Sequence, residues 1–206
     1  MDKLKLTIDG YKCFERKSEF NLNNITLFTG ANSAGKSSVV QSLLLAKITS
    51  ETTIEDVDLG IVPISLMNKK YSMELGNYDD IINRQTKTGD IDFSLSGIDY
   101  YIKGEKNDDV AKNTVVFSIT PEMKNKLKNL FSNGFTYLCA ERTAPHYEYQ
   151  EAEFNDICDC HGSNVGDVFS RYLGDDIIGA RSLNFTKDTK LLMQLDEWCN
   201  YIFPGI

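Results

Sequence analysis

Apolar and polar positions over the first fifty residues predict strands followed by a helix. Residues 3–9 alternate polar and apolar side chains, as in a strand with one buried face, and residues 18–22 form a second extended stretch. Residues 25–29 are apolar and rich in strand formers, which is typical of a parallel strand buried on both faces. Residues 36–48 carry apolar side chains at helical spacing and predict a helix.

The remaining pattern predicts an antiparallel region and then further helices. Short strand-like runs follow one another closely, which suggests an antiparallel meander; they cover residues 71–75, 91–95, 98–102 and 114–119. Thr120 and Pro121 suit the cap and first turn of a helix that runs through Phe131. Before this helix the pattern predicts a surface loop at residues 49–60 and an exposed hairpin end at 103–113. After it the pattern predicts a strand at 135–139, a loop at 141–163, and helices near 165–173 and 188–203.

Composition narrows the class of protein. The chain has 206 residues, 41% of them hydrophobic, and a formal net charge of −8. These values fit one folded globular domain and argue against binding nucleic acid through bulk positive charge, so nucleic acid is expected only through a partner. The pattern lacks both an apolar run long enough for a membrane helix and a secretory signal, so we expect a cytoplasmic protein with no membrane partner. Five cysteines without disulfide spacing favour free thiols.

One motif carries chemistry: Gly30-Ala31-Asn32-Ser33-Ala34-Gly35-Lys36-Ser37 satisfies the Walker A pattern between a predicted strand and a predicted helix. The two glycines let the backbone bend and approach a pyrophosphate closely. Backbone N–H groups from Ser33 to Ser38 can point at phosphate oxygens at a helix N-terminus. Lys36 would bridge the β- and γ-phosphates, and the Ser37 hydroxyl would be the ligand of Mg²⁺.

Residues around this motif resemble known ATPases. The opening Leu6-Thr7-Ile8-Asp9-Gly10-Tyr11-Lys12-Cys13-Phe14, together with the Walker A stretch, is similar to ABC-type ATPases of the SMC, RecF and OLD group. Leu75-Gly76-Asn77-Tyr78-Asp79-Asp80-Ile81-Ile82 and Tyr137-Leu138-Cys139-Ala140-Glu141-Arg142-Thr143-Ala144-Pro145 resemble segments of bacterial antiphage defence ATPases of the Septu and retron-associated group. The resemblance spans almost the whole chain.

The resemblance implies an α/β fold: a P-loop NTPase of the ABC-ATPase type. Residues 1–206 would be a partial ATPase domain, the N-terminal lobe. It would combine a core at residues 1–48, with a mixed sheet around the Walker A helix, an antiparallel β region at 70–119, and an α/β and helical segment at 120–206. The implied cofactors are ATP and Mg²⁺. The implied partners are a second copy or another ATPase chain, and in antiviral defence a nuclease or toxin gated by the ATP state.

By position, the resemblance also assigns roles to three residues outside the central pattern. Lys12 matches a basic residue that approaches the nucleotide, although a solvated turn lysine fits its sequence context equally well. Asn32 matches the asparagine that shapes the phosphate cradle. Glu141 falls where ABC-type ATPases place the Q-loop glutamine and is the only catalytic candidate, with a structural contact to Arg142 as the favoured alternative. The candidate nucleotide-binding residues are Lys12, Gly30, Asn32, Ser33, Ala34, Gly35, Lys36, Ser37 and Ser38, with Ser37 also the metal ligand.

A hydrolysing ABC-type ATPase also needs a Walker B strand that ends in Asp-Glu and a signature loop, and this chain has one stretch that resembles each of them. Leu191-Leu192-Met193-Gln194-Leu195-Asp196-Glu197 resembles a Walker B strand, but its apolar side chains fall at helical spacing, so we predict a helix with Asp196 and Glu197 on its solvated face. Leu95-Ser96-Gly97 imitates a signature loop but lies between strand-like runs and is predicted to be a hairpin turn.

A short cysteine-rich stretch, Cys158-Asp159-Cys160-His161, suggests zinc. His146 and Asp156 could add ligands, but the spacing has no second matching pair. Free thiols in a surface loop are therefore the favoured interpretation.

Two functions from different classes fit these features. The first is the nucleotide-binding part of an ABC-type ATPase whose Walker B and signature residues come from other sequence or another chain. The second is a module that binds nucleotide or a partner without hydrolysis. If the chain stands alone, the last helices, with Trp198 and Phe203, are expected to leave an exposed apolar patch.

Overall fold

The computed structural model describes residues 4–53, 60–87, 89–102, 112–132, 134–141, 144, 158–177 and 188–205. The chain divides into two compact units, Met1–Phe135 and Thr136–Ile206, which are described separately below. Within the described residues, no helix is both long and apolar enough to span a membrane. Of the loop predicted at 49–60, residues 49–51 belong to a helix instead and residues 54–59 lie outside the described residues, as do residues 103–111 of the hairpin end predicted at 103–113.

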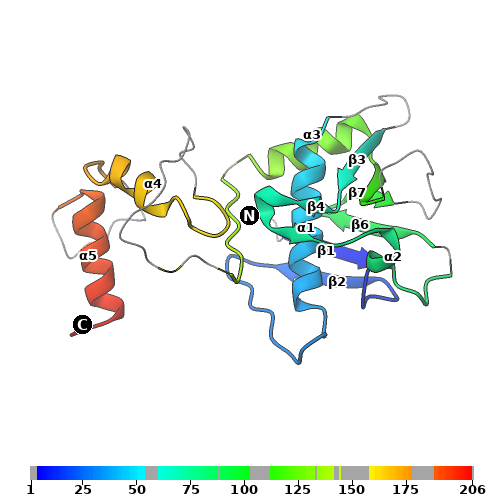
Figure 1. Ribbon diagram of the computed structural model, residues 1–206, viewed down its shortest axis with the longest axis horizontal. Helices are drawn as coiled ribbons and strands as arrows, with labels where there is room; N and C mark the ends of the chain where they lie inside the picture. The colour runs from blue at the N-terminus through cyan, green and yellow to red at the C-terminus, as the bar shows by residue number, and fades with distance from the viewer. Residues whose placement is uncertain are drawn as a thin grey trace. The chain divides into compact units, whose positions relative to one another are not determined.

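The first unit is built on a six-stranded sheet with the order β2-β1-β6-β7-β8-β3 (Figure 1). The strands are β1 (Leu4–Asp9), β2 (Ser18–Leu22), β3 (Ile61–Ser65), β6 (Ile91–Leu95), β7 (Ile98–Ile102) and β8 (Thr114–Ser118). Every neighbouring pair is antiparallel, including the central pairing of Ile8 with Phe93. The sheet was expected to be mixed, and instead the described strands form an antiparallel sheet.

The meander is confirmed for β6, β7 and β8, whereas the strand within 71–75 pairs in a separate two-stranded sheet. The turn between β6 and β7 is a two-residue hairpin. Leu95 pairs with Ile98 across Ser96 and Gly97, which both have positive φ values of 52° and 78°. Two successive left-handed residues match the right-handed twist of the flanking strands, which is why glycine fits there. The stretch at 95–97 is therefore a hairpin turn, as predicted, and not a signature loop.

Alternation along the strands supplies the core of this unit. Leu6 and Ile8 are completely buried, and their counterparts on neighbouring strands include Phe93, Tyr100 and Phe117. Phe93 stacks on Tyr100 with ring centroids 5.3 Å apart, and Phe117 lies 5.8 Å from Tyr100. This aromatic cluster joins β6, β7 and β8 and gives the sheet one apolar face.

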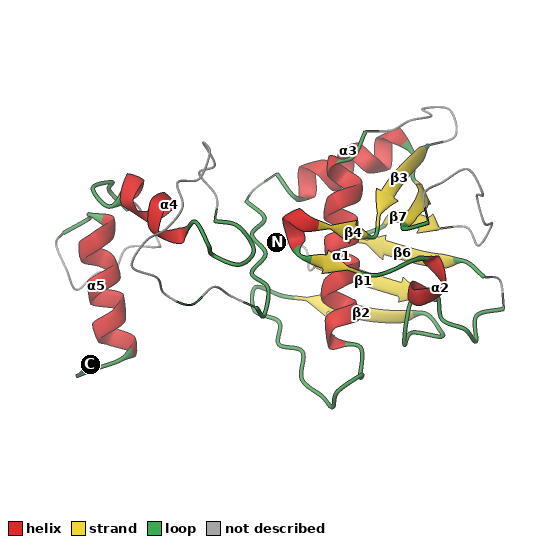
Figure 2. Ribbon diagram, viewed as in Figure 1, coloured by secondary structure: helices red, strands yellow, loops and turns green. Residues whose placement is uncertain are grey.

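Two helices pack against the sheet and against each other (Figure 2). Helix α1 (Lys36–Glu51) contacts β3, and helix α3 (Pro121–Leu130) contacts β7. Thr120 caps α3 by accepting from the Met123 N–H at 3.3 Å, as its sequence predicts. Helix α1 extends beyond residue 48, the predicted end, because its last turn is buried and Thr52 satisfies the Ile48 carbonyl.

Shorter elements complete the first unit. They are β4 (Met67–Asn68), the 3₁₀ turn Lys69–Tyr71, β5 (Met73–Glu74) and α2 (Tyr78–Ile81). The strand expected at 71–75 is thus reduced to Met73–Glu74. Strand β3 was not predicted, since Pro63 interrupts its pattern. It lies at the edge of the sheet and pairs on one side only, with β8, so the N–H group that Pro63 lacks costs little stability.

Two predicted strands are absent from the described structure. Residues 25–29 form no strand, and Ile25 and Leu27 are 90% and 82% exposed. Residues 135–139 are likewise irregular. A strand needs at least one neighbouring strand to pair with, and a parallel strand also needs cover on both faces; among the described residues no strand pairs with either segment. The predictions of a buried parallel strand at 25–29 and of a strand at 135–139 were therefore wrong.

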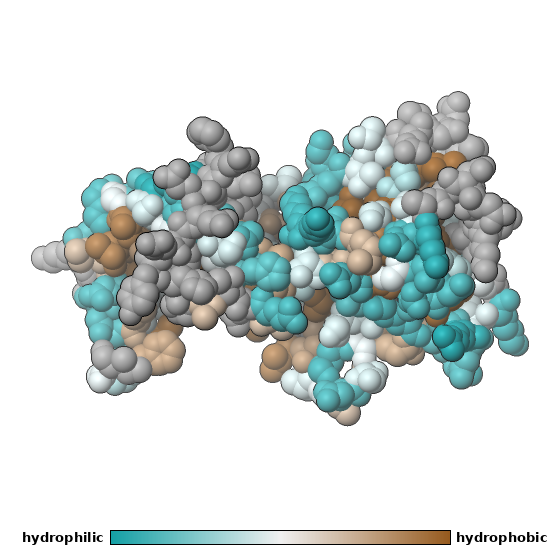
Figure 3. All heavy atoms as spheres, in the orientation of Figure 1, coloured by the Kyte–Doolittle hydropathy of each residue, from teal (hydrophilic) through white to brown (hydrophobic). Residues whose placement is uncertain are grey.

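The second unit contains helices α4 (Val165–Tyr172) and α5 (Leu191–Ile202). Both were predicted, and α5 confirms that the stretch resembling Walker B is helical, with Asp196 exposed and Glu197 partly exposed. Helix α5 and the residue after it expose apolar side chains, as expected, and Figure 3 shows apolar surface at this end of the chain. The exposed apolar residues are Leu192, Met193, Trp198, Tyr201, Ile202 and Phe203.

The cysteines of this unit are not all on the surface. Cys160 is 5% exposed and Cys139 is 8% exposed, whereas Cys199 is exposed. The surface-loop prediction was wrong for Cys160 because its carbonyl accepts the Cys139 N–H at 2.9 Å, which draws the two segments together. All cysteines among the described residues are free thiols, and His146 and Asp156 lie outside those residues.

Candidate nucleotide-binding site

The Walker A residues form a loop that closes onto the N-terminus of α1. Ser33 and Gly35 adopt left-handed backbone with φ values of 64° and 90°, and Gly35 is the N-cap of the helix. Ala34 N–H donates to the Ala31 carbonyl at 3.3 Å, which tightens the turn. Gly35 has no side chain to cap the helix, so the first-turn N–H groups are left for a ligand rather than a cap.

Lys36 lies over this loop. Its Nζ donates to the carbonyl oxygens of Gly30 at 2.8 Å and Ala31 at 2.6 Å. The positive charge is therefore held at the same point as the first turn of α1, where the helix dipole also favours an anion. A phosphate placed there would meet a cation and backbone donors together.

The two serines that follow differ in accessibility. The Ser37 side chain is exposed, so its hydroxyl is accessible to a cation, whereas Ser38 is buried against the protein. Asn32, Ser33 and Ala34 are exposed at the tip of the loop. The structure thus offers Ser37 as the metal-ligand candidate, while Ser38 can contribute its backbone N–H.

The turn at residues 11–14 packs against the phosphate-binding loop at Gly35. Cys13 and Phe14 lie so close to Gly35 that a Cβ atom on that glycine would be 2.5 Å from Cys13 Sγ and 2.8 Å from Phe14 Cζ. Phe14 in turn packs edge-on against Phe20, with centroids 5.6 Å apart. Gly35 is therefore required by both its backbone conformation and its surroundings.

Lys12 belongs to this same turn and is anchored rather than solvated. Its Nζ donates to Gln41 Oε1 on α1 at 2.7 Å, and the side chain is half-buried. Burial lowers the pKa of Lys12, while the nearby Cys13 and Asp80 partly offset this effect. The interpretation of Lys12 as a free turn lysine is thus wrong; its approach to a nucleotide stays a prediction.

Two of the segments that resemble the ATPase motifs meet beside the loop. Lys12 N–H donates to the Ile81 carbonyl at 2.7 Å, and Asn83 Nδ2 donates to the Lys12 carbonyl at 2.6 Å. Asn77 and Asp80 cap α2 reciprocally, which fixes the end of this segment. Between the two segments lies an open cleft of about 690 Å³, lined by Lys12, Cys13, Glu15, Asp79, Asp80, Ile82, Asn83, Arg84 and Gln85. Spacing along the chain gave no signal for this cleft.

Glu141, the catalytic candidate, belongs to the second unit. Its side chain is exposed, and its carbonyl oxygen lies 3.0 Å from Cys139 Sγ and 2.6 Å from His161 Nδ1. The contact with Arg142 lies outside the described residues. The structure therefore gives the Glu141 backbone a role within its own unit, and a role for its carboxylate stays a prediction.

A glycine-capped helix, a lysine over the loop and an exposed serine define a P-loop protein that binds nucleotides. A family model described as AAA domain matches residues 5–195, and the chain belongs to this family. The α/β P-loop NTPase class predicted from the sequence is thus confirmed, and AAA domains are nucleotide-binding ATPases that generally use ATP with Mg²⁺. Neither a search of the curated proteins nor a search of the solved structures found a match.

Proposed function

We propose that the loop at residues 30–38 binds ATP together with Mg²⁺. The observation that carries the proposal is the coincidence of the Lys36 ammonium with the uncapped first turn of α1. Lys36 would exchange the Gly30 and Ala31 carbonyls for phosphate oxygens, and Ser37 would hold Mg²⁺ through its exposed hydroxyl. The choice of adenine over guanine rests on the family and the resemblance, because a phosphate loop does not read the base.

Hydrolysis is proposed to require Walker B and signature residues from other sequence or from another chain. Within the described residues no strand ends in an Asp-Glu pair, since the stretch that resembles Walker B is helix α5. Other sequence or another ATPase chain would supply the acidic and signature residues, and the exposed apolar side chains of α5 support association with a second chain. A non-hydrolysing binding module is the alternative, and the helical state of α5 favours it for the isolated chain.

Calorimetric titration with Mg-ATP tests the binding proposal. Loss of a charge-assisted hydrogen bond costs about 1.5–3 kcal/mol, so Lys36→Ala should weaken affinity by about 10- to 150-fold. Ser37→Ala should lower affinity when Mg²⁺ is present and leave binding in EDTA unchanged. Lys126→Ala removes one exposed positive charge from α3, where Lys126 pairs with Glu122, and should bind like the parent chain. Equal affinity of the parent chain and Lys36→Ala would refute the site.

Turnover separates the two forms of the proposal. Micromolar Mg-ATP binding without phosphate release by the isolated chain, and release after a second ATPase chain is added, supports the two-chain ATPase. Turnover by the isolated monomer that Lys36→Ala abolishes would show that the catalytic residues are already in this chain. Sedimentation velocity with and without Mg-ATP checks the expected association.

For the biological setting we propose bacterial antiviral defence, in which the ATP state gates a nuclease or toxin that alone contacts nucleic acid. The support is the resemblance of residues 75–82 and 137–145 to the Septu and retron-associated ATPases. In a host that carries the complete locus, Lys36→Ala should restore phage plaque formation by orders of magnitude. Unchanged protection by the variant would remove this setting while leaving nucleotide binding intact.

A further inference from the structure

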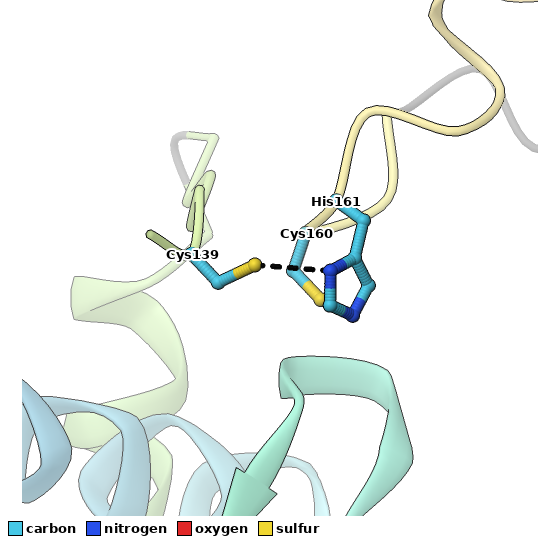
Figure 4. A group of neighbouring side chains, drawn as sticks. All are labelled: Cys139, Cys160 and His161. Atoms are coloured by element: carbon cyan, nitrogen blue, oxygen red, sulfur yellow. Dashed lines mark hydrogen bonds between the residues drawn. The ribbon is translucent and has the colours of Figure 1, made fainter. Parts of the chain in front are cut away.

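Three side chains of metal-binding type converge within the second unit (Figure 4). Cys139, Cys160 and His161 place their ligand atoms within 4.8 Å of one another, and Cys139 Sγ is 3.1 Å from His161 Nδ1. Cys139 comes from one segment and the other two residues from a turn further along the chain, so the group arises from folding and not from a local sequence motif.

The backbone holds both segments in place without help from these side chains. Cys139 N–H donates to the Cys160 carbonyl at 2.9 Å. The turn that carries Cys160 and His161 is organised by Asp159, whose carboxylate accepts the N–H groups of His161 at 2.8 Å and Ser163 at 3.2 Å. Helix α4 begins directly after this turn. The two segments that carry the ligand groups are therefore preorganised, which reduces the entropy lost when an ion is bound.

A backbone oxygen orients the imidazole. The Glu141 carbonyl lies 2.6 Å from His161 Nδ1, and a carbonyl can only accept, so Nδ1 must carry the hydrogen. The lone pair then resides on Nε2, which is free to bind a cation. A carbonyl that fixes the tautomer of a histidine in this way is the usual outer support of a metal-binding imidazole.

The donor set selects the ion. Two thiolates and one imidazole suit zinc, with about 2.3 Å to sulfur and about 2.0 Å to nitrogen, which sets tetrahedral ligand atoms roughly 3.5–3.8 Å apart. The ligand atoms of the group lie within 4.8 Å of one another, and because Cys139 Sγ lies 3.1 Å from Nδ1, the imidazole must rotate to bring Nε2 to that separation from the two sulfur atoms. Three protein ligands leave the fourth position to solvent.

The second unit also has little else to stabilise it. Among its described residues only Cys139, Cys160 and Val168 are buried apolar side chains, and the first two belong to the cluster. Small cores of this kind are commonly completed by a metal or a disulfide.

We propose that Cys139, Cys160 and His161 bind one zinc ion that ties the segment at 139–141 to the turn at 158–164. Zinc replaces the protons of the two thiols, which are released to solvent as the ion binds. The ion is structural in its effect, since it joins two segments of the second unit. This site is independent of the nucleotide-binding loop.

Titration of the reduced, metal-free full chain with Co²⁺ tests the proposal. We expect one Co²⁺ per chain, with the thiolate charge-transfer and tetrahedral d–d absorption bands, and displacement of Co²⁺ by one equivalent of Zn²⁺. Cys139→Ser and Cys160→Ser should each weaken binding by more than about 100-fold, and His161→Gln by at least about tenfold. The control Cys199→Ser changes an exposed thiol of the same unit and should bind normally.

Two readouts guard against variants that simply misfold. Far-ultraviolet circular dichroism of each metal-free variant should match that of the metal-free parent chain, and Zn²⁺ should raise the melting temperature of the parent and Cys199→Ser chains but not of Cys139→Ser. Absence of stoichiometric tetrahedral Co²⁺ bands in the reduced parent chain would overturn the proposal. So would binding that survives in both cysteine variants, or a reduced chain that binds no ion and forms a Cys139–Cys160 disulfide on oxidation.

Discussion

Replacing Gly35 by alanine probes the phosphate loop most sharply, because the structure separates two costs of that change. The left-handed backbone at φ 90° costs a residue with a Cβ atom roughly 1–2 kcal/mol. Contacts of the new methyl at 2.5 Å from Cys13 Sγ and 2.8 Å from Phe14 Cζ add overpacking of about 1–3 kcal/mol. We therefore expect Gly35→Ala to lower the free energy of unfolding by about 2–5 kcal/mol and to abolish nucleotide binding.

Urea denaturation followed by circular dichroism measures this loss, and two further variants resolve it. Gly97→Ala has a similar φ of 78° with no atom within 4 Å of its added Cβ, so it should show only the backbone cost. Adding Cys13→Ala to Gly35→Ala removes the closest contact and should recover about 1 kcal/mol. If Gly35→Ala unfolds within about 0.5 kcal/mol of the parent chain, the contact between the turn and the loop is not as described.

Three other predictions follow from single side chains. Lys12→Met should weaken Mg-ATP binding by about tenfold in calorimetric titration, while Gln41→Ala, which removes only the anchor of that lysine, should have a smaller effect. Tyr100→Phe should raise the free energy of unfolding by about 1 kcal/mol in urea, because the Tyr100 hydroxyl is buried with no hydrogen-bond partner among the described residues. Burial raises the pKa of Glu51, but hydrogen bonds from Lys70 and Lys47 outweigh it and lower the pKa. The resulting stability is present above the ordinary glutamate pKa and lost as pH falls through the lowered value, so Glu51→Gln should flatten the acid side of a melting-temperature profile.

The sequence predicted best what is decided locally. The alternation of apolar and polar residues predicted strands β1, β6 and β7, and Gly97 predicted the hairpin between two of them. Both features depend on residues that are neighbours in the sequence. The same holds for Thr120, which caps α3 where its sequence position indicates. Helical spacing also separated α5 from the Walker B strand that it imitates.

What the sequence could not predict depends on contacts between distant segments. Residues 25–29 have strand-like composition but stay irregular, since strand formation needs partners that composition does not reveal. The anchoring of Lys12 by Gln41 and the meeting of Cys139 with Cys160 join residues far apart along the chain. No periodicity reports such pairs. The Walker A loop was predictable because its chemistry is contained in eight consecutive residues, whereas its supporting turn was not.

The turn at residues 11–14 makes the phosphate loop mechanically dependent on a remote segment. The Lys12 backbone is hydrogen-bonded to Ile81 and Asn83, and the Lys12 side chain is hydrogen-bonded to Gln41 on α1. Cys13 and Phe14 fill the space next to Gly35. Any rotation of the N-terminal end of α1 must therefore either carry the end of α2 with it or break these bonds. A displacement of the phosphate loop is therefore transmitted to the end of α2, and a displacement of α2 is transmitted to the loop.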